Sequence, residues 1–298
     1  MTLSTESALV AITGASTGIG AATAREMAAR GFHVLAGVRR QSDAEAIRGP
    51  NVEPLELDIT NPEHIRALAT RVREDSLGRP IRAVVNNAAV QANVPIEAFS
   101  IERWRDMFEV NLFGHVAVTQ ALLPLLIESG GRVINISSVG GKIAMATYGP
   151  YAATKFALEA VSDSLRREVA RHGVQVVVIE PGAVRTEMLG RAVAGAKDSL
   201  SAMTAEQRRR YGALVHAVNA QAEASTKSGL PAEAAAAVIV KAVTVRKPRT
   251  RYTVGREAAL LSMTRLLPDR LLDCMFAAAL RPHLRKGFQF SSASTADR

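Results

Sequence analysis

Short apolar runs alternate with longer helical patterns along the first 180 residues, and this alternation constrains the fold most strongly. The runs are β-branched and apolar at successive positions, which is typical of strands buried on both faces. They lie at residues 8–12, 33–38, 52–57, 81–85, 132–136 and 174–179. The helical patterns lie near residues 19–30, 62–77, 101–128 and 152–172. This order predicts an α/β fold with a doubly wound parallel sheet, because right-handed crossovers place helices on both faces.

The remainder of the chain predicts one domain over residues 1–255 with a helical extension. A helix at 231–245 precedes a candidate seventh strand at 251–254. The segment 187–229 is long, polar and alanine-rich, which predicts a substrate lid or a mobile segment. Residues 256–290 form a helical pattern that Pro268 divides, and the polar residues 291–298 are expected to be disordered.

Composition excludes several classes of function. The formal net charge is +9, but aromatic residues make up only 4% of the chain and do not interleave with the basic ones. We therefore expect a basic solvated surface and no nucleic-acid partner. The six histidines show no metal-site spacing, so no metal is expected. The single cysteine, Cys274, fits a reducing compartment and favours a cytoplasmic protein.

No segment is expected to cross a membrane. The N-terminus lacks a basic segment followed by an apolar signal core. The apolar stretch at residues 121–127 is short and contains Pro124, so it does not have the length of a bilayer span.

A glycine-rich loop follows the first strand. Gly14, Gly18 and Gly20 are spaced G-x3-G-x-G, with Ser16, Thr17 and Ile19 between them. A tight turn without side chains lets backbone approach a pyrophosphate, and the following helix N-terminus supplies N–H donors. The loop therefore predicts dinucleotide binding at this place in the fold.

The end of the second strand indicates which dinucleotide is bound. An Asp or Glu there would hold a ribose 2′-hydroxyl, but this chain has Arg39 and Arg40. Arginine pairs with a 2′-phosphate, which a carboxylate would repel. We therefore expect NADP(H) as the cofactor.

Tyr151 and Lys155 form a candidate acid/base pair at the start of a helix. Residues four apart share a helix face, and a nearby ammonium favours the phenolate and lowers the pKa of a tyrosine. Tyr148 is not expected to take this part, because the residue four positions later is Ala152. Ser138 follows the fifth strand, so it belongs on the same rim of the sheet as the glycine loop. Asn87, Ala88, Pro181 and Gly182 are expected on that rim as well.

These motifs resemble those of the short-chain dehydrogenase/reductase family, in its single-domain branch, over roughly residues 8–255. The matching residues, in order along the chain, are Thr13, Gly14, Gly18, Ile19, Gly20, Asp58, Asn86, Asn87, Ala88, Asn111, Ser138, Tyr151, Lys155, Pro181, Gly182 and Thr186. The run at residues 148–160 is most similar to the group of 17β-hydroxysteroid and retinol dehydrogenases. Two small departures are Ala89, where the family has glycine, and Thr154, where it has serine.

The resemblance implies a Rossmann fold and assigns roles at the reaction centre. It makes Tyr151 the general acid/base, while Ser138 orients the substrate oxygen and Lys155 binds the nicotinamide ribose. Asn111 would hold a water that links Lys155 to solvent.

For the rest of the cofactor, the resemblance places Asp58 at the adenine, beside Ile59, and Thr186 at the nicotinamide end. The family also implies a homodimer or homotetramer.

The function that follows is NADP(H)-dependent interconversion of an alcohol and a ketone or aldehyde, on a lipophilic substrate. One alternative is a 3-oxoacyl-carrier-protein ketoreductase, which only the positive net charge favours. Another is a non-enzymatic NADPH sensor, but such a protein would be expected to lose the proton-handling residues. An epimerase or dehydratase would need different glycine spacing and a larger C-terminal domain.

An apolar stripe follows Pro268. One helix face would carry Leu271, Leu272, Met275, Phe276, Ala279 and Leu280. The stripe could pack on the domain or a subunit, close the substrate pocket, or rest on a membrane surface. For the last case, Arg281, His283, Arg285 and Lys286 follow directly and could contact anionic head groups.

Overall fold

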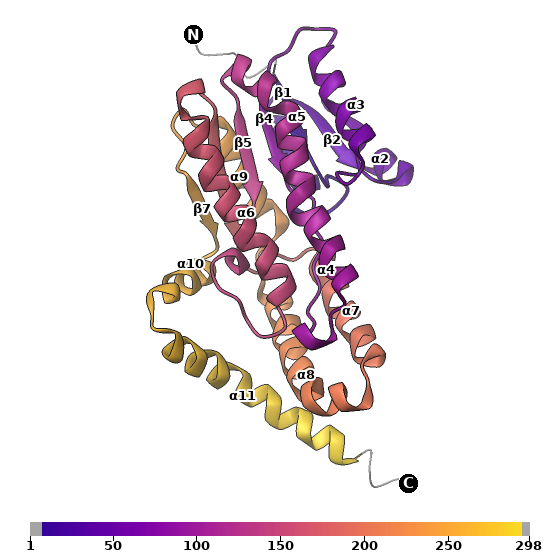
Figure 1. Cartoon of the computed structure of the whole chain (residues 1–298). Coiled ribbons are helices and arrows are strands. Elements are labelled where there is room, and N and C mark those ends of the chain that lie inside the picture. The colour runs from indigo at the N-terminus through magenta and orange to yellow at the C-terminus, as the bar shows by residue number, and fades with distance from the viewer. Residues whose placement is uncertain (1–7, 294–298) are drawn as a thin grey trace.

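A computed structural model describes residues 8–293 and is built on one parallel sheet (Figure 1). The strand order is β3-β2-β1-β4-β5-β6-β7, and every neighbouring pair is parallel. The strands are β1 (Leu9–Ile12), β2 (His33–Val38), β3 (Val52–Glu56), β4 (Ile81–Asn86), β5 (Arg132–Ile136), β6 (Gln175–Pro181) and β7 (Arg251–Val254). The order reverses beside β1, between β2 and β4, so the predicted doubly wound sheet is confirmed.

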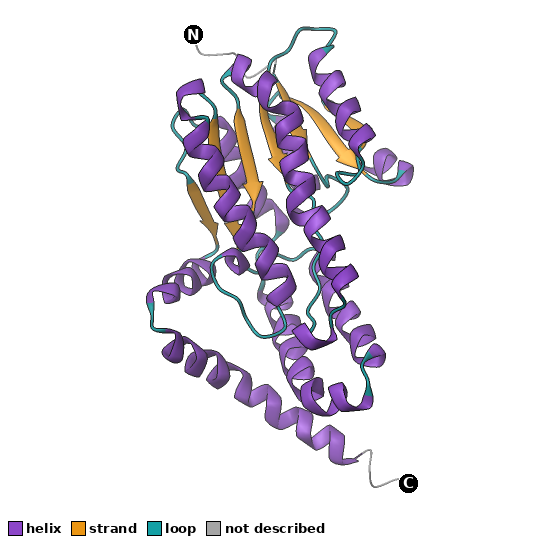
Figure 2. Cartoon of the chain, viewed as in Figure 1, coloured by secondary structure: helices purple, strands orange, loops and turns teal. Residues whose placement is uncertain are grey.

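Helices cover both faces of the sheet (Figure 2). One face packs against α1 (Gly18–Ala29), α2 (Gln41–Ile47) and α9 (Ala232–Thr244), and the other against α3 (Pro62–Arg73), α5 (Gly114–Ser129) and α6 (Gly149–Glu168). The central strand β1 is buried along its whole length, as its continuous apolar run predicts. The short helix α2 was not among the predicted elements.

The helix predicted over residues 101–128 is interrupted. It consists of α4 (Ile101–Phe108), a π-helical turn (Glu109–Phe113) and α5. By length and composition alone, Ile101–Ser129 could cross a membrane. However, Val118, Leu122 and Leu126 are fully buried against the sheet, as in the core helix of a folded domain. The π-helical turn matters more, because it places the fully buried Asn111 near the carboxyl edge of the sheet.

The segment 187–229, predicted as a substrate lid or a mobile segment, forms two helices. They are α7 (Glu187–Ala202) and α8 (Ala205–Ser228), and both project beyond the carboxyl edge of the sheet (Figure 1). A capping box begins α8, since Thr204 Oγ1 accepts from the Gln207 amide and Gln207 Oε1 accepts from the Thr204 amide. Met203 and Val215 pack with Tyr151 in a third apolar cluster, so this segment covers the end of the sheet.

Two further helices follow β7. They are α10 (Arg256–Met263) and α11 (Asp269–Ala293), with a 3₁₀ turn at Thr264–Leu266 and Pro268 between them. In Figure 1, α11 crosses below the sheet to reach α8. The helix continues through Ala293, beyond the predicted boundary at 290, and residues 294–298 lie outside the described chain.

Candidate active site

The glycine loop forms an open cradle between β1 and α1. Gly14 and Gly18 have φ values of 63° and 55°, which residues with a side chain rarely adopt. A Cβ at Gly20 would collide with the Gly14 carbonyl oxygen and the Asn87 amide. Asn87 braces the loop, because its Nδ2 donates to the carbonyl oxygens of Thr13 and Gly14, both at 3.0 Å. These residues fit a dinucleotide pyrophosphate, which needs close backbone approach.

Arg39 and Arg40 are both exposed at the end of β2, and of the two only Arg39 lines the same cavity. Asp58 and Ile59 line the cavity beyond β3. Burial raises the pKa of Asp58, but hydrogen bonds from Thr60 and the charge of Arg39 bring it below its ordinary value. This end of the cavity therefore carries one cation and one carboxylate, with no carboxylate on β2 itself.

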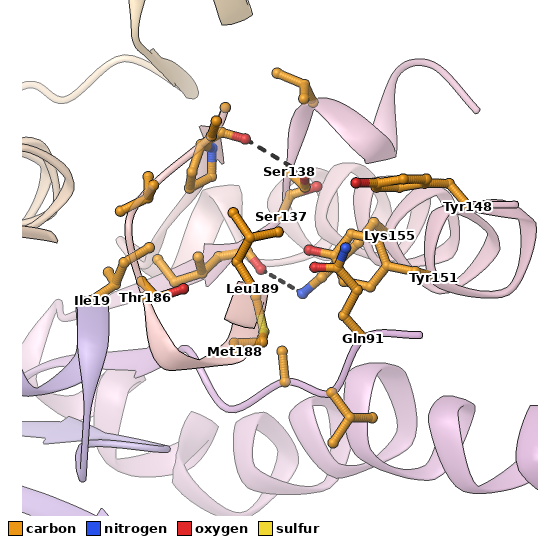
Figure 3. A pocket seen from close by; sticks show the side chains of 18 of the residues that line it. Ile19, Gln91, Ser137, Ser138, Tyr148, Tyr151, Lys155, Thr186, Met188 and Leu189 are labelled. Atoms are coloured by element: carbon orange, nitrogen blue, oxygen red, sulfur yellow. Dashed lines mark hydrogen bonds between the residues drawn. The ribbon is translucent and has the colours of Figure 1, made fainter. Parts of the chain in front are cut away.

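Tyr151, Ser138 and Lys155 lie close together in the wall of the cavity (Figure 3). The Ser138 hydroxyl donates to the Pro181 carbonyl at 3.5 Å and accepts from the Gly140 amide at 3.0 Å. Lys155 Nζ lies 5.7 Å from the centre of the Tyr151 ring and donates to the Ile136 carbonyl at 2.9 Å. The predicted pair therefore shares one helix face, and β5 delivers Ser138 beside it.

The expected lowering of the Tyr151 pKa by Lys155 is not found. Burial raises the pKa of Tyr151 to about 12, although a hydrogen bond with Ser138 opposes this rise. Burial also lowers the pKa of Lys155 to about 8, while the negative charge of Glu159 raises it. Desolvation dominates at both groups because each is almost fully buried.

Asn111 lies behind this group, and hydrogen bonds occupy its carboxamide. Its Oδ1 accepts from the Val90 amide at 2.8 Å, and its Nδ2 donates to the Val90 carbonyl at 2.8 Å and to Thr154 Oγ1 at 3.1 Å. Asn111 thus braces the segment after β4 against α6, and the water-holding role remains a prediction.

The cavity has a volume of about 590 Å³ and brings together most of the predicted site residues. Those that line it are Gly14, Ser16, Thr17, Gly18, Ile19, Arg39, Asp58, Ile59, Asn87, Ala88, Ser138, Tyr151, Lys155, Pro181, Gly182 and Thr186. Three predicted residues lie outside its lining: Gly20, Arg40 and Asn111. Within the part of the chain that the structure describes, no group of three or more His, Cys, Asp or Glu residues could hold a metal ion.

Several residues that line the cavity were not predicted from the sequence. Gln91, Tyr148, Met188 and Leu189 line the cavity close to Ser138 and Tyr151 (Figure 3). Tyr148 had been set aside as a catalytic residue, yet it lies three residues before Tyr151, and this spacing could have placed it on the same helix face. Thr147 precedes it with a φ of 66°, which is unusual for a β-branched residue.

Helices α7, α8, α10 and α11 form a helical cover that lines the apolar end of the cavity. Met188 and Leu189 come from α7, Val218 and Ala222 from α8, and Leu261 from α10. From α11 come Leu272, Met275, Phe276, Ala279 and Leu280, which belong to the predicted apolar stripe. The cavity combines a glycine cradle, an arginine beside it and a buried Tyr-Ser-Lys group under an apolar cover. These features define the class of protein as a dinucleotide-binding oxidoreductase.

Comparison with known proteins identifies the family. The model of the short chain dehydrogenase family matches residues 8–197, and the chain belongs to this family. It is 35% identical to an NADPH-dependent 3-dehydrocapnine reductase of Ornithobacterium rhinotracheale, over 91% of this chain and 96% of the relative. It is 34% identical to 17-beta-hydroxysteroid dehydrogenase type 6 of Rattus norvegicus, over 91% of this chain and 88% of that one. The suspected family resemblance is thus confirmed.

Solved structures agree with the fold. A short chain dehydrogenase from Burkholderia cenocepacia in complex with NADP superimposes with a TM-score of 0.72 at 25% identity, covering 92% of this chain and 99% of that one. The Ornithobacterium reductase is NADPH-dependent and the Burkholderia structure contains NADP, in agreement with the predicted cofactor.

Proposed function

We propose that this protein is an NADP(H)-dependent oxidoreductase that interconverts a lipophilic alcohol and its ketone or aldehyde, with Tyr151 as general acid/base. The observation that carries the proposal is one continuous cavity. It joins the glycine cradle and Arg39 at one end to Tyr151 and Ser138, and then to the apolar cover. Cofactor, proton donor and apolar substrate thus have places within one enclosure.

The proton transfer depends on Tyr151, Ser138 and Lys155. When bound, NADPH supplies the hydride for the carbonyl carbon. The Tyr151 hydroxyl donates its proton to the carbonyl oxygen, and Ser138 donates a hydrogen bond to the same oxygen. A Tyr151 pKa of about 12 keeps the phenol protonated at neutral pH, which is the form that reduction requires. Lys155, in its ammonium form, stabilises the phenolate that remains.

Arg39 is the residue that selects the cofactor. Its guanidinium would pair with the adenosine 2′-phosphate, and Asp58 would hold the adenine. The NADPH of the Ornithobacterium reductase and the NADP of the Burkholderia structure support this assignment.

The apolar cover supports a lipophilic substrate. Leu272, Phe276 and Leu280 recur every four residues on the half-buried ridge of α11, and all three line the cavity. The similarity to a 3-dehydrocapnine reductase and to a 17-beta-hydroxysteroid dehydrogenase supports the same proposal. We propose a substrate with a long or polycyclic apolar body.

The test is a panel of carbonyl compounds with the purified protein, followed by the loss of NADPH absorbance. The panel holds long-chain 3-oxo compounds, steroid-sized ketones, retinal, small ketones and a carrier-protein-linked 3-oxoacyl chain. We expect turnover of large lipophilic members and little of small ones. Turnover of the carrier-linked chain alone would favour the ketoreductase alternative. NADPH binding without turnover of any member would favour a sensor.

We further propose that the corner between α10 and α11 rests on an anionic membrane surface, so that the protein is peripheral to a membrane. Leu260, Met263, Leu266, Leu271 and Met275 are exposed there, and Leu266 is 86% exposed. The arginines Arg256, Arg265 and Arg270 are exposed around them. Three carboxylates, Glu257, Asp269 and Asp273, are exposed in the same segment. The proposal rests on the exposed apolar side chains with arginines beside them, which suit the interface of an anionic bilayer.

Vesicle sedimentation tests the membrane contact. The protein should bind vesicles that contain phosphatidylserine, and Leu266→Asp should weaken this binding, while phosphatidylcholine vesicles should bind little. If the variant instead changes the mass measured by light scattering and leaves vesicle binding intact, the patch joins copies of this chain in a homodimer or homotetramer.

A further inference from the structure

Glu159 is a buried carboxylate that the proposed chemistry does not use. It lies on α6, one helical turn after Lys155, and only 6% of its surface is exposed. Burial of an unpaired charge in this position would cost free energy, so a carboxylate buried directly behind a reaction centre requires cations or hydrogen-bond donors as partners.

Its partners come from two other segments. Lys142, just after the 3₁₀ turn that follows Ser138, donates to Glu159 Oε2 at 2.7 Å. Arg251, at the start of β7, donates to the same oxygen at 3.1 Å. Within the described residues, Oε1 has no hydrogen-bond partner. The carboxylate therefore fastens the Ser138 segment and β7 to the helix that carries Lys155.

A second glutamate, Glu180, extends this ion-pair network to the edge of the sheet where Pro181 lines the cavity. Glu180 directly precedes Pro181 and is 3% exposed. Its Oε1 lies 3.3 Å from Lys142 and 3.4 Å from Arg251. Asp163 pairs with Arg251 at 2.8 Å, farther along α6. Lys142 and Arg251 are thus shared among three carboxylates, and Asp163 pairs with Arg166 as well, at 3.0 Å. Of these carboxylates, Glu159 is the one that lies a single helical turn from Lys155.

Lys155 itself has no carboxylate in hydrogen-bond contact within the described chain. Its amine donates to the Ile136 carbonyl, and the groups that face it are Tyr151 on its own helix and His115 on α5. Burial, together with the charge of Lys155, lowers the pKa of His115 to about 3, so the imidazole is neutral. Tyr148 faces Tyr151 and is protonated, since burial raises its pKa. Glu159 is therefore the nearby anion that favours the ammonium form of Lys155.

We propose that Glu159 is a positioning residue that keeps Lys155 in its ammonium form behind Tyr151 and, through Lys142, holds the Ser138 segment in place. The inference rests on the proposed function, in which the charged Lys155 assists the proton transfer of Tyr151. The pKa of Lys155, about 8, lies close enough to neutral pH for one neighbouring charge to change its protonation state.

The experiment measures kcat for carbonyl reduction as a function of pH. The alkaline limb is the part of this profile above neutral pH in which kcat falls. Glu159→Gln removes a negative charge, so the pKa values of Lys155 and Tyr151 should fall and the alkaline limb should move about one unit to lower pH. Lys142→Gln removes a positive charge from the same network and should move the limb to higher pH. Opposite shifts from two partners of one ion pair would not arise from general loosening.

The controls separate charge from structure. Asp163→Asn lies one further turn along α6, still contacts Arg251, and should leave the limb in place. Glu159→Asp keeps the charge and should restore most of the wild-type profile. A uniform loss of kcat with an unmoved limb in both Glu159→Gln and Lys142→Gln would overturn the proposal and leave only a structural role.

A second readout keeps the inference separate from the proposed activity. Lys155 lies in the cofactor cavity, so the pH at which NADPH fluorescence reports weaker binding should shift in the same directions. If the wild-type protein reduces no carbonyl compound, the proposed function fails, but these binding profiles still test Glu159. Identical binding profiles in the wild-type protein and both charge variants would overturn it.

Discussion

Tyr151 is chemically useful because of where its side chain is buried. It lies in the cavity beside Ser138, and it also packs with Met203 and Val215 of the helical cover. Packing fixes the phenol ring, which is the condition for proton transfer in a defined direction. Burial also raises the pKa of Tyr151 to about 12, so reduction has a protonated donor across the neutral range.

Tyr151→Phe is expected to leave the fold and NADPH binding intact and to lower kcat by roughly 10²- to 10⁴-fold, the usual contribution of a general acid. Steady-state kinetics on a substrate from the carbonyl panel, with NADPH fluorescence as the binding control, make the measurement. Wild-type kcat in this variant would show that another group delivers the proton.

Arg39→Asp is expected to weaken NADPH binding and shift preference toward NADH. The new carboxylate would repel a 2′-phosphate and could accept from a ribose 2′-hydroxyl. Dissociation constants for both cofactors are compared in the wild-type protein and the variant, with Arg40→Asp as a matched control because Arg40 lies outside the cavity. Equal affinities of the wild-type protein for NADPH and NADH would contradict the assignment.

Local spacing explains which site residues could be predicted. Tyr151 and Lys155 share a helix turn, and the glycines share a loop, so each set is fixed within a few residues of sequence. Gln91 and Met188 reach the cavity only because separate strands end at one rim, and no periodic pattern marks them. The pKa of Tyr151 was mispredicted because desolvation depends on the cover, whose packing cannot be inferred from the Tyr-Lys spacing.

At the scale of elements, α11 is the part of the cover with the least buried surface. Leu272, Phe276 and Leu280 are half-buried, whereas Leu271 and Met275 are 48% and 45% exposed. No side chain described in residues 269–284 is fully buried, and this helix follows a break at Pro268. Such elements belong to the less stable parts of a fold.

Phe276→Asp is expected to raise KM for steroid-sized or long-chain ketones by about tenfold and to leave small ketones unaffected, because a carboxylate would enter the apolar wall. Ala277→Asp is the matched control, since Ala277 is exposed on the same helix. Equal effects of both variants on KM would mean that α11 does not contact the substrate.

The helices of the cover were harder to predict than the sheet. The segment 187–229 was predicted as a substrate lid or a mobile segment with no helix bounds, although Thr204 and Gln207 show the spacing of a capping box. Alanine-rich helices such as α8 have a weak apolar stripe, so their periodicity is hard to detect. The strands gave continuous apolar runs, and their predicted bounds lie within two residues of the observed ones.

The whole molecule is basic, yet the buried charges of the described residues include three carboxylates, and each of them has an arginine partner. The Asp75 side chain is 1% exposed and accepts hydrogen bonds from Arg79 and Arg71. These bonds, from Arg79 first, hold the pKa of Asp75 well below its usual range against the effect of burial. A carboxylate with a depressed pKa in the folded state contributes stability above its unfolded pKa, and this contribution is lost as the pH falls.

Asp75→Asn is expected to lower the free energy of unfolding by about 2 kcal/mol at pH 7, as for the loss of charged hydrogen bonds. The difference from wild type should shrink below about pH 4, where the unfolded aspartate is protonated. Thermal unfolding at pH 7 and in acid measures both effects, with the exposed Asp106→Asn as the control. A difference that stays constant across this range would exclude the ionic contribution.

The order of parts along the chain has a practical consequence. The glycine cradle, Ser138, Tyr151 and Lys155 all precede Gly255, while α10 and α11 follow it. Gly255, with a φ of 101°, therefore marks the point in the chain between the reaction residues and this closing wall. Exchange of the tail beyond Gly255 for one of different length and polarity would redirect the protein to other substrates without rebuilding its chemistry.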